Sequence, residues 1–100
     1  MVKHIILWQL SDSLSDEQKE NVKNAAKENL ELLKGKIPGL IDIKVQISKL
    51  KSSTADMMLD SSFESEQALK DYSVNPFHTA VADKFVRPFI KARNCLDFEA

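Results

Sequence analysis

The sequence is poor in the residues that mark several large classes of protein. It contains one cysteine in 100 residues, so no disulfide can form within the chain, and a lone thiol is typical of a reducing compartment. Its glycines, Gly35 and Gly39, are too few for a phosphate-cradling loop, which disfavours nucleotide binding. No apolar run approaches the roughly 20 residues of a membrane helix, and the N-terminus shows no signal-peptide pattern. We therefore expect a cytoplasmic protein without a membrane partner.

Charged residues are abundant, but neither sign is in excess. The chain has 14 Lys and Arg against 15 Asp and Glu, with a formal net charge of −1. Because the two signs are interleaved, no basic patch for nucleic acid is present. Hydrophobic residues make up 43% of the chain, as in an ordinary globular protein. The length and composition predict a single domain over residues 1–100, and we expect no cofactor.

Periodicity and turn signals predict alternating strands and helices. Ser15 and Gln18 have the spacing of a capping box at a helix N-terminus, and Gly35 is placed to end that helix. Asn75-Pro76 and Arg87-Pro88 interrupt the second helical region, because proline disfavours helix at the preceding residue. The predicted strands are Val2–Leu10, Leu40 to about Ile47, about Asp56 to Phe63, and about Ala92 to Phe98. The predicted helical segments follow Ser15, follow Ser65, and run from His78 to about Val86.

The first predicted strand is apolar on both faces. Ile5 and Leu7 alternate with His4, Ile6, Trp8 and Leu10, so both faces require cover. In the second strand, alternation places Ile41, Ile43, Val45 and Ile47 together on one face. A chain of this length can cover one face of its sheet with its own helices but has little left for the other, which favours a partner subunit.

The element order predicts an α+β fold of the ferredoxin-like plait type. Strand, helix, strand, strand, helix, strand gives two right-handed βαβ halves and a four-stranded antiparallel sheet with the helices on one face. The open face of that sheet is substantially apolar. Two such sheets packed face to face would form a dimeric α/β barrel, so we expect a homodimer through the open sheet face.

Three side chains are candidates for chemistry: His4, Tyr72 and His78. Tyr72 lies near the end of one helical segment and His78 opens the next, so the two can converge across the helix break. An imidazole base and a phenol donor suit proton abstraction next to a carbonyl group. Each residue also has a structural interpretation: His4 as a satisfied core residue, Tyr72 as a packing residue, and His78 as a cap or a contact of Asp71 or Asp83.

The space between sheet and helices is the expected pocket, with Ile6, Trp8, Leu59, Ser61 and Arg93 as further lining residues. Arg93 either binds a ligand carboxylate there or pairs with Asp97 or Asp60 at the dimer seam, and we favour the seam. Cys95 is either a thiol whose pKa Arg93 lowers or, as strand cysteines usually are, a small core residue. The usual metal-binding spacings are absent, so no metal site is predicted.

Several stretches, in order along nearly the whole chain, resemble the stress-responsive A/B barrel domain (Dabb) family. They are Val2-Lys3-His4-Ile5, Leu14-Ser15, Ile37-Pro38-Gly39-Leu40, Phe63-Glu64-Ser65, Ala68-Leu69-Lys70-Asp71-Tyr72, Asn75-Pro76-Phe77-His78, Phe85-Val86-Arg87-Pro88 and Asp97-Phe98. The resemblance implies the ferredoxin-like plait that dimerises into a barrel.

The resemblance implies less about function. One branch of the family, which resembles olivetolic acid cyclase, closes linear polyketides by aldol condensation with a cavity Tyr and His, matched here by Tyr72 and His78, with His4 also on the cavity side. The leading expectation is a small-molecule pocket with acid–base chemistry on a carbonyl or polyketide-like compound. The alternatives are a non-catalytic ligand-binding or stress-related dimer, and a heme- or quinone-type monooxygenase of the dimeric barrel class.

Overall fold

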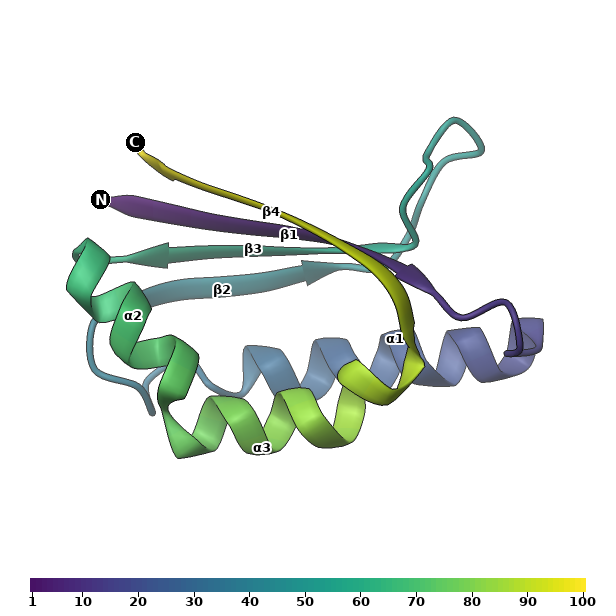
Figure 1. Ribbon diagram of the computed structural model, residues 1–100, viewed down its shortest axis with the longest axis horizontal. Coiled ribbons are helices and arrows are strands. Elements are labelled where there is room, and N and C mark those ends of the chain that lie inside the picture. The colour runs from purple at the N-terminus through teal and green to yellow at the C-terminus, as the bar shows by residue number, and fades with distance from the viewer.

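The computed structural model describes residues 1–100 as one sheet layered on helices (Figure 1). The sheet has the order β2-β3-β1-β4 with every neighbouring pair antiparallel, and the helices lie on one of its faces. This is the predicted ferredoxin-like plait. The elements are β1 (Val2–Leu10), α1 (Asp16–Glu31), β2 (Leu40–Gln46), β3 (Met57–Phe63), α2 (Glu66–Val74), α3 (Pro76–Phe85), a 3₁₀ turn (Arg87–Phe89) and β4 (Ile90–Glu99). None of the helices is long and apolar enough to cross a bilayer.

The helix starts follow the capping signals in the sequence. Ser15 accepts a hydrogen bond from the backbone of Gln18, whose side chain accepts one from the Ser15 backbone, so the predicted capping box is present. The Ser65 side chain caps α2 by accepting a hydrogen bond from the backbone N–H of Ala68. Asn75 accepts from Phe77 and caps α3. These caps fix where α2 ends and α3 begins.

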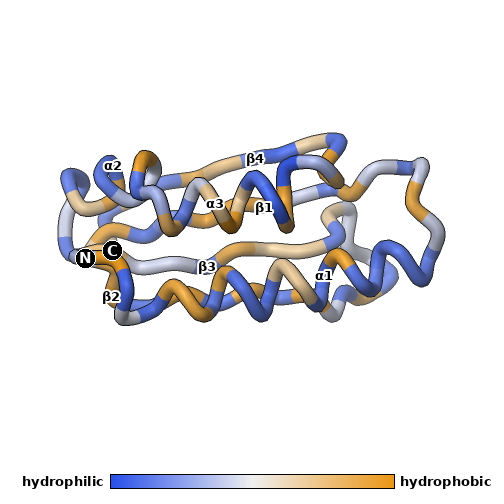
Figure 2. The backbone as a smooth tube through the Cα atoms, turned by 90° about the horizontal axis from the view of Figure 1, so that it is seen from below, coloured by the Kyte–Doolittle hydropathy of each residue, from blue (hydrophilic) through white to orange (hydrophobic).

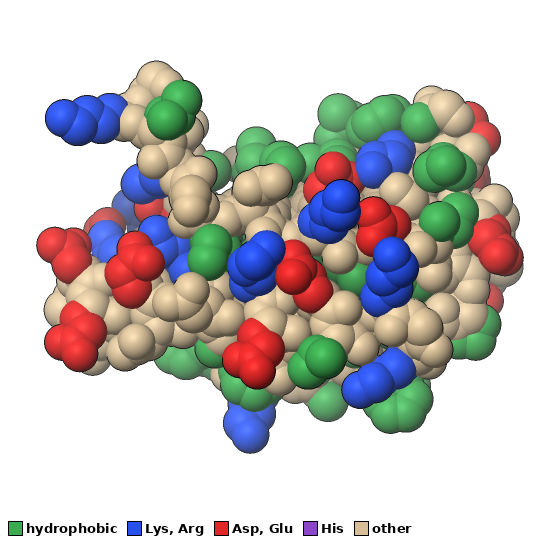
Figure 3. All heavy atoms as spheres, turned by 180° about the vertical axis from the view of Figure 1, so that it is seen from behind, with side chains coloured by type: hydrophobic (Ala, Val, Ile, Leu, Met, Phe, Trp, Pro, Cys, Tyr) green, Lys and Arg blue, Asp and Glu red, His purple; other side chains and the backbone are tan.

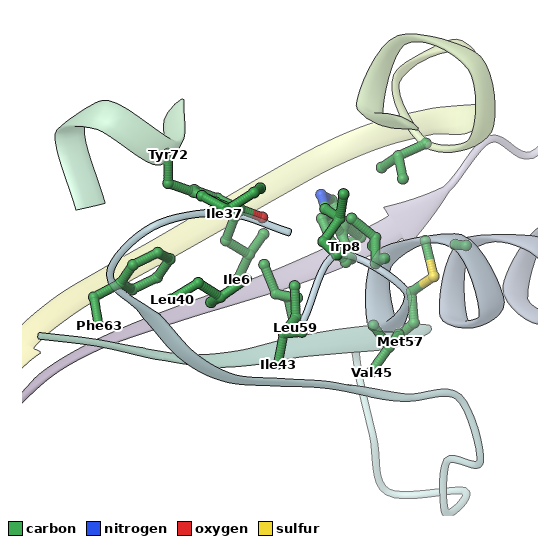
Figure 4. Packing of buried hydrophobic residues seen from close by; sticks show 14 of the residues in the cluster. Ile6, Trp8, Ile37, Leu40, Ile43, Val45, Met57, Leu59, Phe63 and Tyr72 are labelled. Carbon is green, nitrogen blue, oxygen red and sulfur yellow. The ribbon is translucent and has the colours of Figure 1, made fainter. Parts of the chain in front are cut away.

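The hydrophobic core lies between the sheet and the helices. Figure 2 looks onto the helix side of the molecule, where hydrophobic stretches alternate with hydrophilic ones along α1 and α3. Figure 4 shows the sheet side of this core, where Ile6, Trp8, Leu59 and Phe63 project toward the helices. The full buried cluster is Val2, Ile6, Trp8, Leu10, Val22, Ala26, Leu30, Leu33, Ile37, Leu40, Ile43, Val45, Met57, Leu59, Phe63, Tyr72 and Val86.

Strand β2 departs from the predicted alternation. Leu40 pairs with Phe63 but Asp42 pairs with Ser62, so the register shifts at Ile41, as in a β-bulge. The core residues are therefore Leu40, Ile43 and Val45, whereas Ile41 is 41% exposed. The prediction that Ile41 shares the buried face was wrong, because the extra residue breaks the strict period of two.

The face of the sheet opposite the helices is uncovered in the subunit. Leu7, on one of the two β1 faces expected to need cover, is 41% exposed in the subunit, and Leu96 and Phe98 on β4 are 63% and 43% exposed. Leu96 lies opposite Ile5 and Phe98 opposite Lys3, so these side chains share the outer face. Lys3 forms an ion pair with Asp60 on the same face at 2.6 Å. Only one face of β1 is buried by the chain itself.

The loop from residue 47 to residue 56 projects away from the helices beside this open face (Figures 1 and 3). Its base is held by Asp56, which was predicted to start β3 but precedes it. The Asp56 carboxylate accepts hydrogen bonds from the Leu10 backbone at 2.7 Å and from Lys49 at 2.8 Å, and the side chain of Gln9 donates to the Thr54 carbonyl at 2.7 Å. Hydrophobic side chains line the sheet-side edge next to the loop in Figure 3.

Candidate functional site

The break between α2 and α3 brings Tyr72 and His78 together. The N–H of Asn75 donates to the Tyr72 carbonyl at 3.1 Å, which closes the end of α2, and Pro76 starts α3. Across this tight connection the phenol and imidazole rings stack, with centroids 4.1 Å apart and planes 31° from parallel. The sequence predicted this convergence, and the structure places the two rings in contact.

Both polar groups of this pair are buried without a partner. Tyr72 is 1% exposed, and its ring packs on Phe63 with centroids 4.9 Å apart. Neither the Tyr72 hydroxyl nor His78 Nδ1 has a hydrogen-bond partner in the protein. A buried hydroxyl without a partner costs about 1–3 kcal/mol, so such groups are rare in cores and call for an explanation. Figure 4 shows Tyr72 reaching from α2 over the sheet.

The surroundings of the pair set the protonation states that acid–base chemistry needs. Burial raises the pKa of the Tyr72 hydroxyl far above its ordinary value of 10.0, so it remains a proton donor in hydrogen bonds. Burial, aided by the nearby Arg87 guanidinium, lowers the pKa of His78 from its ordinary value of 6.5. Hydrogen bonding with the backbone of Ser73 and Tyr72 acts in the opposite direction but does not prevail. At neutral pH the site therefore holds a neutral imidazole beside a neutral phenol.

His4 lies on β1 beneath this pair. It is 7% exposed, and its ring centroid is 6.3 Å from that of Tyr72. His4 Nδ1 is hydrogen-bonded to the carboxylate of Asp97, which lies opposite it on β4. A carboxylate on one ring nitrogen fixes the orientation of an imidazole and the position of its proton. His4 is thus an anchored polar group, as the structural interpretation of this residue required.

His4, Tyr72 and His78 border one pocket of ≈ 340 Å³ between the sheet and α2 and α3. This volume is at the lower end of the range for small-molecule sites, which run from about 300 to 1,000 Å³. The pocket has 12 lining residues: His4, Ile6, Trp8, Leu69, Tyr72, Ser73, His78, Ala82, Val86, Arg87, Ile90 and Arg93. A mostly apolar wall with a few converging polar groups is typical of a binding site.

The predicted lining residues divide into two groups. Ile6, Trp8 and Arg93 line the pocket as expected. Leu59 and Ser61 do not, because β3 lies deeper in the sheet and both side chains are fully buried. Leu59 packs in the core, and the Ser61 hydroxyl donates to the His4 carbonyl at 2.9 Å. Ser61 therefore supports the strand that carries His4.

Within the subunit, Arg93 does not form the ion pair with Asp97 or Asp60 that the seam interpretation offered. Asp97 pairs with His4, Asp60 pairs with Lys3, and Arg93 forms no ion pair. Arg93 lies opposite Trp8, on the face of the sheet that carries the helices. It reaches both this pocket and a second, more open one of ≈ 650 Å³. His4 also lines both, so the two pockets adjoin.

Cys95 differs from both expectations. It is exposed rather than a core residue. Partial burial and the Asp97 carboxylate raise the pKa of its thiol, and Arg93 acts in the opposite direction without prevailing. The contact of Asp97 with His4 was not predicted, although pairing the first and last strands of a plait would have placed the two residues opposite each other. The structural interpretation of His78 finds no support, because Asp83 pairs with Arg87 and Asp71 with Gln67.

The topology and the enclosed Tyr–His pair define the class: a ferredoxin-like α+β plait with a mostly apolar pocket between sheet and helices. The model of the stress responsive A/B barrel domain, Dabb, matches residues 2–100. The chain therefore belongs to the Dabb family. Among curated proteins, none matches the sequence.

Solved structures agree with this assignment. A dimeric protein of unknown function with a ferredoxin-like fold, from Bacteroides fragilis, is 33% identical, with a TM-score of 0.91 over 99% of this chain and 95% of that one. A hydroxynitrile lyase from Passiflora edulis is 19% identical, with a TM-score of 0.71 over 97% and 90% of the two chains. An antibiotic biosynthesis monooxygenase is 12% identical, with a TM-score of 0.74 over 100% and 98%. The last two show the fold alone.

Proposed function

We propose that this Dabb protein binds a small carbonyl compound in the Tyr72–His78 pocket and catalyses proton transfer at the carbon next to the carbonyl group. The observation that supports this most is the pair of buried, unpartnered polar atoms, the Tyr72 hydroxyl and His78 Nδ1, on two residues that line one pocket. A carbonyl ligand would supply an acceptor for the phenol and an acidic C–H for the imidazole.

The proposed step needs only side chains. The neutral His78 imidazole takes a proton from the α-carbon, and the electron pair of that C–H bond forms the enolate. The Tyr72 hydroxyl donates a hydrogen bond to the enolate oxygen, where negative charge develops. The enolate carbon then either recovers the proton from the His78 imidazolium or attacks a second carbonyl carbon of the same ligand. In the second case the π electron pair of that carbonyl group moves to its oxygen, and the resulting alkoxide takes the proton from His78. That second course is an aldol cyclisation.

His4 and Arg93 have supporting places in this proposal. Asp97 holds the His4 ring in the pocket wall below Tyr72, where it gives the ligand a further polar contact. Arg93 lies at the junction of the two pockets with no acidic partner, so it can receive a carboxylate or enolate group of a longer ligand. A polyketide-like compound with a terminal carboxylate combines these features.

The experiment is hydrogen–deuterium exchange at the α-carbons of simple ketones, followed by NMR in D₂O with the buffer rate subtracted. 2-Butanone, cyclohexanone and acetophenone sample sizes that suit the pocket. General base catalysis typically contributes about 10²–10⁴-fold, so His78→Gln should lower the protein-dependent rate at least about 10²-fold, and Tyr72→Phe should lower it as well. Val74→Ala changes an exposed residue at the end of α2 and is the matched control.

The thermal midpoint of each variant is measured in parallel. Loss of exchange in both site variants, with midpoints near or above the wild-type value, supports the catalytic proposal. An equal rate of α-carbon exchange in wild type and His78→Gln would refute the catalytic proposal. Ketone binding without exchange in the wild type would instead favour the non-catalytic ligand-binding dimer.

We further propose that the subunits pair through the open sheet face. Leu7, Leu96 and Phe98 form an exposed apolar surface there, and the Lys3–Asp60 ion pair at its side is already neutralised within the subunit. Burying such a surface stabilises a dimer by about 25 cal/mol per Å² before association costs. The protein from Bacteroides fragilis, 33% identical to this chain, is itself dimeric.

A further inference from the structure

A second group of reactive side chains, His4, Cys95 and Asp97, lies beside the proposed catalytic pair. We propose that these residues bind a divalent transition-metal ion of the Zn²⁺ class. Their ligand atoms, His4 Nδ1, Cys95 Sγ and a carboxylate oxygen of Asp97, all lie within 4.8 Å of one another. Tyr72 and His78 contribute nothing to this cluster, so the inference does not depend on the proposed proton transfer.

The sheet brings the three side chains together. Cys95 and Asp97 are two residues apart on β4, so they project from the same face of the strand. His4 on β1 lies directly opposite Asp97, and Ile6 directly opposite Cys95, which puts the imidazole on that face too. Neighbouring strands of a hydrogen-bonded sheet hold this triangle on a rigid frame, as a metal site requires.

The separations suit a small tetrahedral ion. Cys95 Sγ is 3.8 Å from His4 Nδ1 and 3.5 Å from the Asp97 carboxylate. Zinc bonds of about 2.3 Å to sulfur and 2.0–2.1 Å to nitrogen or oxygen place tetrahedral ligand atoms about 3.3–3.6 Å apart. His4 and Asp97 are closer than this because they share a hydrogen bond. The ion would replace the proton shared by His4 Nδ1 and Asp97, which is released to solvent, and the half-exposed Asp97 carboxylate would rotate to make room for it.

The donor set selects the class of metal. Mg²⁺ and Ca²⁺ take oxygen ligands and would leave the thiolate and the imidazole unused. One sulfur, one nitrogen and one oxygen donor match Zn²⁺ and its spectroscopic substitute Co²⁺. Three protein ligands leave one position for water or a small ligand, as in catalytic rather than structural zinc sites.

The cluster is also accessible. All three residues line the open pocket of ≈ 650 Å³. The Asp97 side chain is 46% exposed and Cys95 is exposed, whereas His4 is buried and anchors the site. An ion can therefore enter from solvent, and its fourth position would face the open pocket.

The experiment is titration of the full-length protein with Co²⁺, followed by absorption spectroscopy. Because Cys95 is the only cysteine of the chain, a thiolate-to-Co²⁺ charge-transfer band in the near ultraviolet can arise only from this site. We expect this band, together with the visible bands of four-coordinate Co²⁺ and their loss on adding Zn²⁺. Asp97→Asn should weaken Co²⁺ binding at least tenfold, and Cys95→Ser should abolish the near-ultraviolet band.

Exposed Cys95 and Asp97 tolerate these changes without loss of the core, and circular dichroism checks that each variant is folded. His78→Gln is the matched control: it should bind Co²⁺ as the wild type does while losing ketone exchange. The proposal is overturned if wild type shows no charge-transfer band at a large molar excess of Co²⁺, or if Asp97→Asn binds with unchanged affinity. Absence of ketone exchange would contradict the proposed proton transfer but not the Co²⁺ result, so each proposal can be refuted without the other.

Discussion

Replacing Tyr72 by phenylalanine should make the protein more stable. The change removes only the hydroxyl group, which is buried and has no hydrogen-bond partner. The ring contacts with Phe63 and His78, at centroid distances of 4.9 and 4.1 Å, remain. Desolvating an unpartnered hydroxyl costs about 1–3 kcal/mol, so Tyr72→Phe should raise the free energy of unfolding by about that amount.

Urea unfolding measures this change in the free energy of unfolding. The protein concentration is held fixed, because the stability of a dimer depends on concentration. For a chain of this size, about 1 kcal/mol corresponds to a rise of roughly 4–8 °C in the thermal midpoint. Tyr72→Leu, which removes the ring as well, should be destabilising and serves as the contrast. A Tyr72→Phe variant less stable than wild type by about 1 kcal/mol would show that the hydroxyl is satisfied in the fold, and the reasoning would be refuted.

Further predictions concern the fold, the interface and pH. Gly39→Ala should lower the free energy of unfolding by about 2–5 kcal/mol, because φ is +82° and a Cβ would lie 2.5 Å from the Cβ of Ala68. Gly35→Ala is the contrast: φ is +84° but the space is open, so urea unfolding should show a loss of only about 1–2 kcal/mol. Leu96→Glu should convert a dimer to a monomer in light scattering, and an unchanged mass would argue against the open-face interface. Folding lowers the pKa of His78, so as pH falls this imidazole takes up a proton in the unfolded chain before it does in the folded protein. The free energy of unfolding should therefore fall as pH drops below about 6.5. His78→Gln should flatten this dependence, and an unaltered profile would contradict the lowered pKa.

Most of the fold could be predicted because its signals are local. The capping box at Ser15, the cap at Ser65 and the break at Pro76 act within a few residues, and the structure contains all of them. The bulge at Ile41 could not be predicted, because nothing in the local pattern separates an extra residue from continued alternation. It depends on how β2 pairs with β3.

The candidate site likewise has a part that local sequence signals predict and a part that depends on strand pairing. Tyr72 and His78 are six positions apart across a proline break, so their approach followed from sequence spacing. The contact of His4 with Asp97 joins opposite ends of the chain, and only the pairing of β1 with β4 creates it. For the same reason the residue spacing in the sequence did not indicate the metal site that we propose. The exposure of Cys95 depends on β4 being an edge strand.

A crystal structure of the protein with acetylacetone, a small mimic of an enolate, tests the central proposal most directly. The account predicts one ligand oxygen within about 2.6–3.2 Å of the Tyr72 hydroxyl, with the central carbon facing His78 Nδ1, in the pocket that His4 and Trp8 also line. A ligand bound elsewhere, with both the Tyr72 hydroxyl and His78 Nδ1 hydrogen-bonded to protein groups, would contradict it.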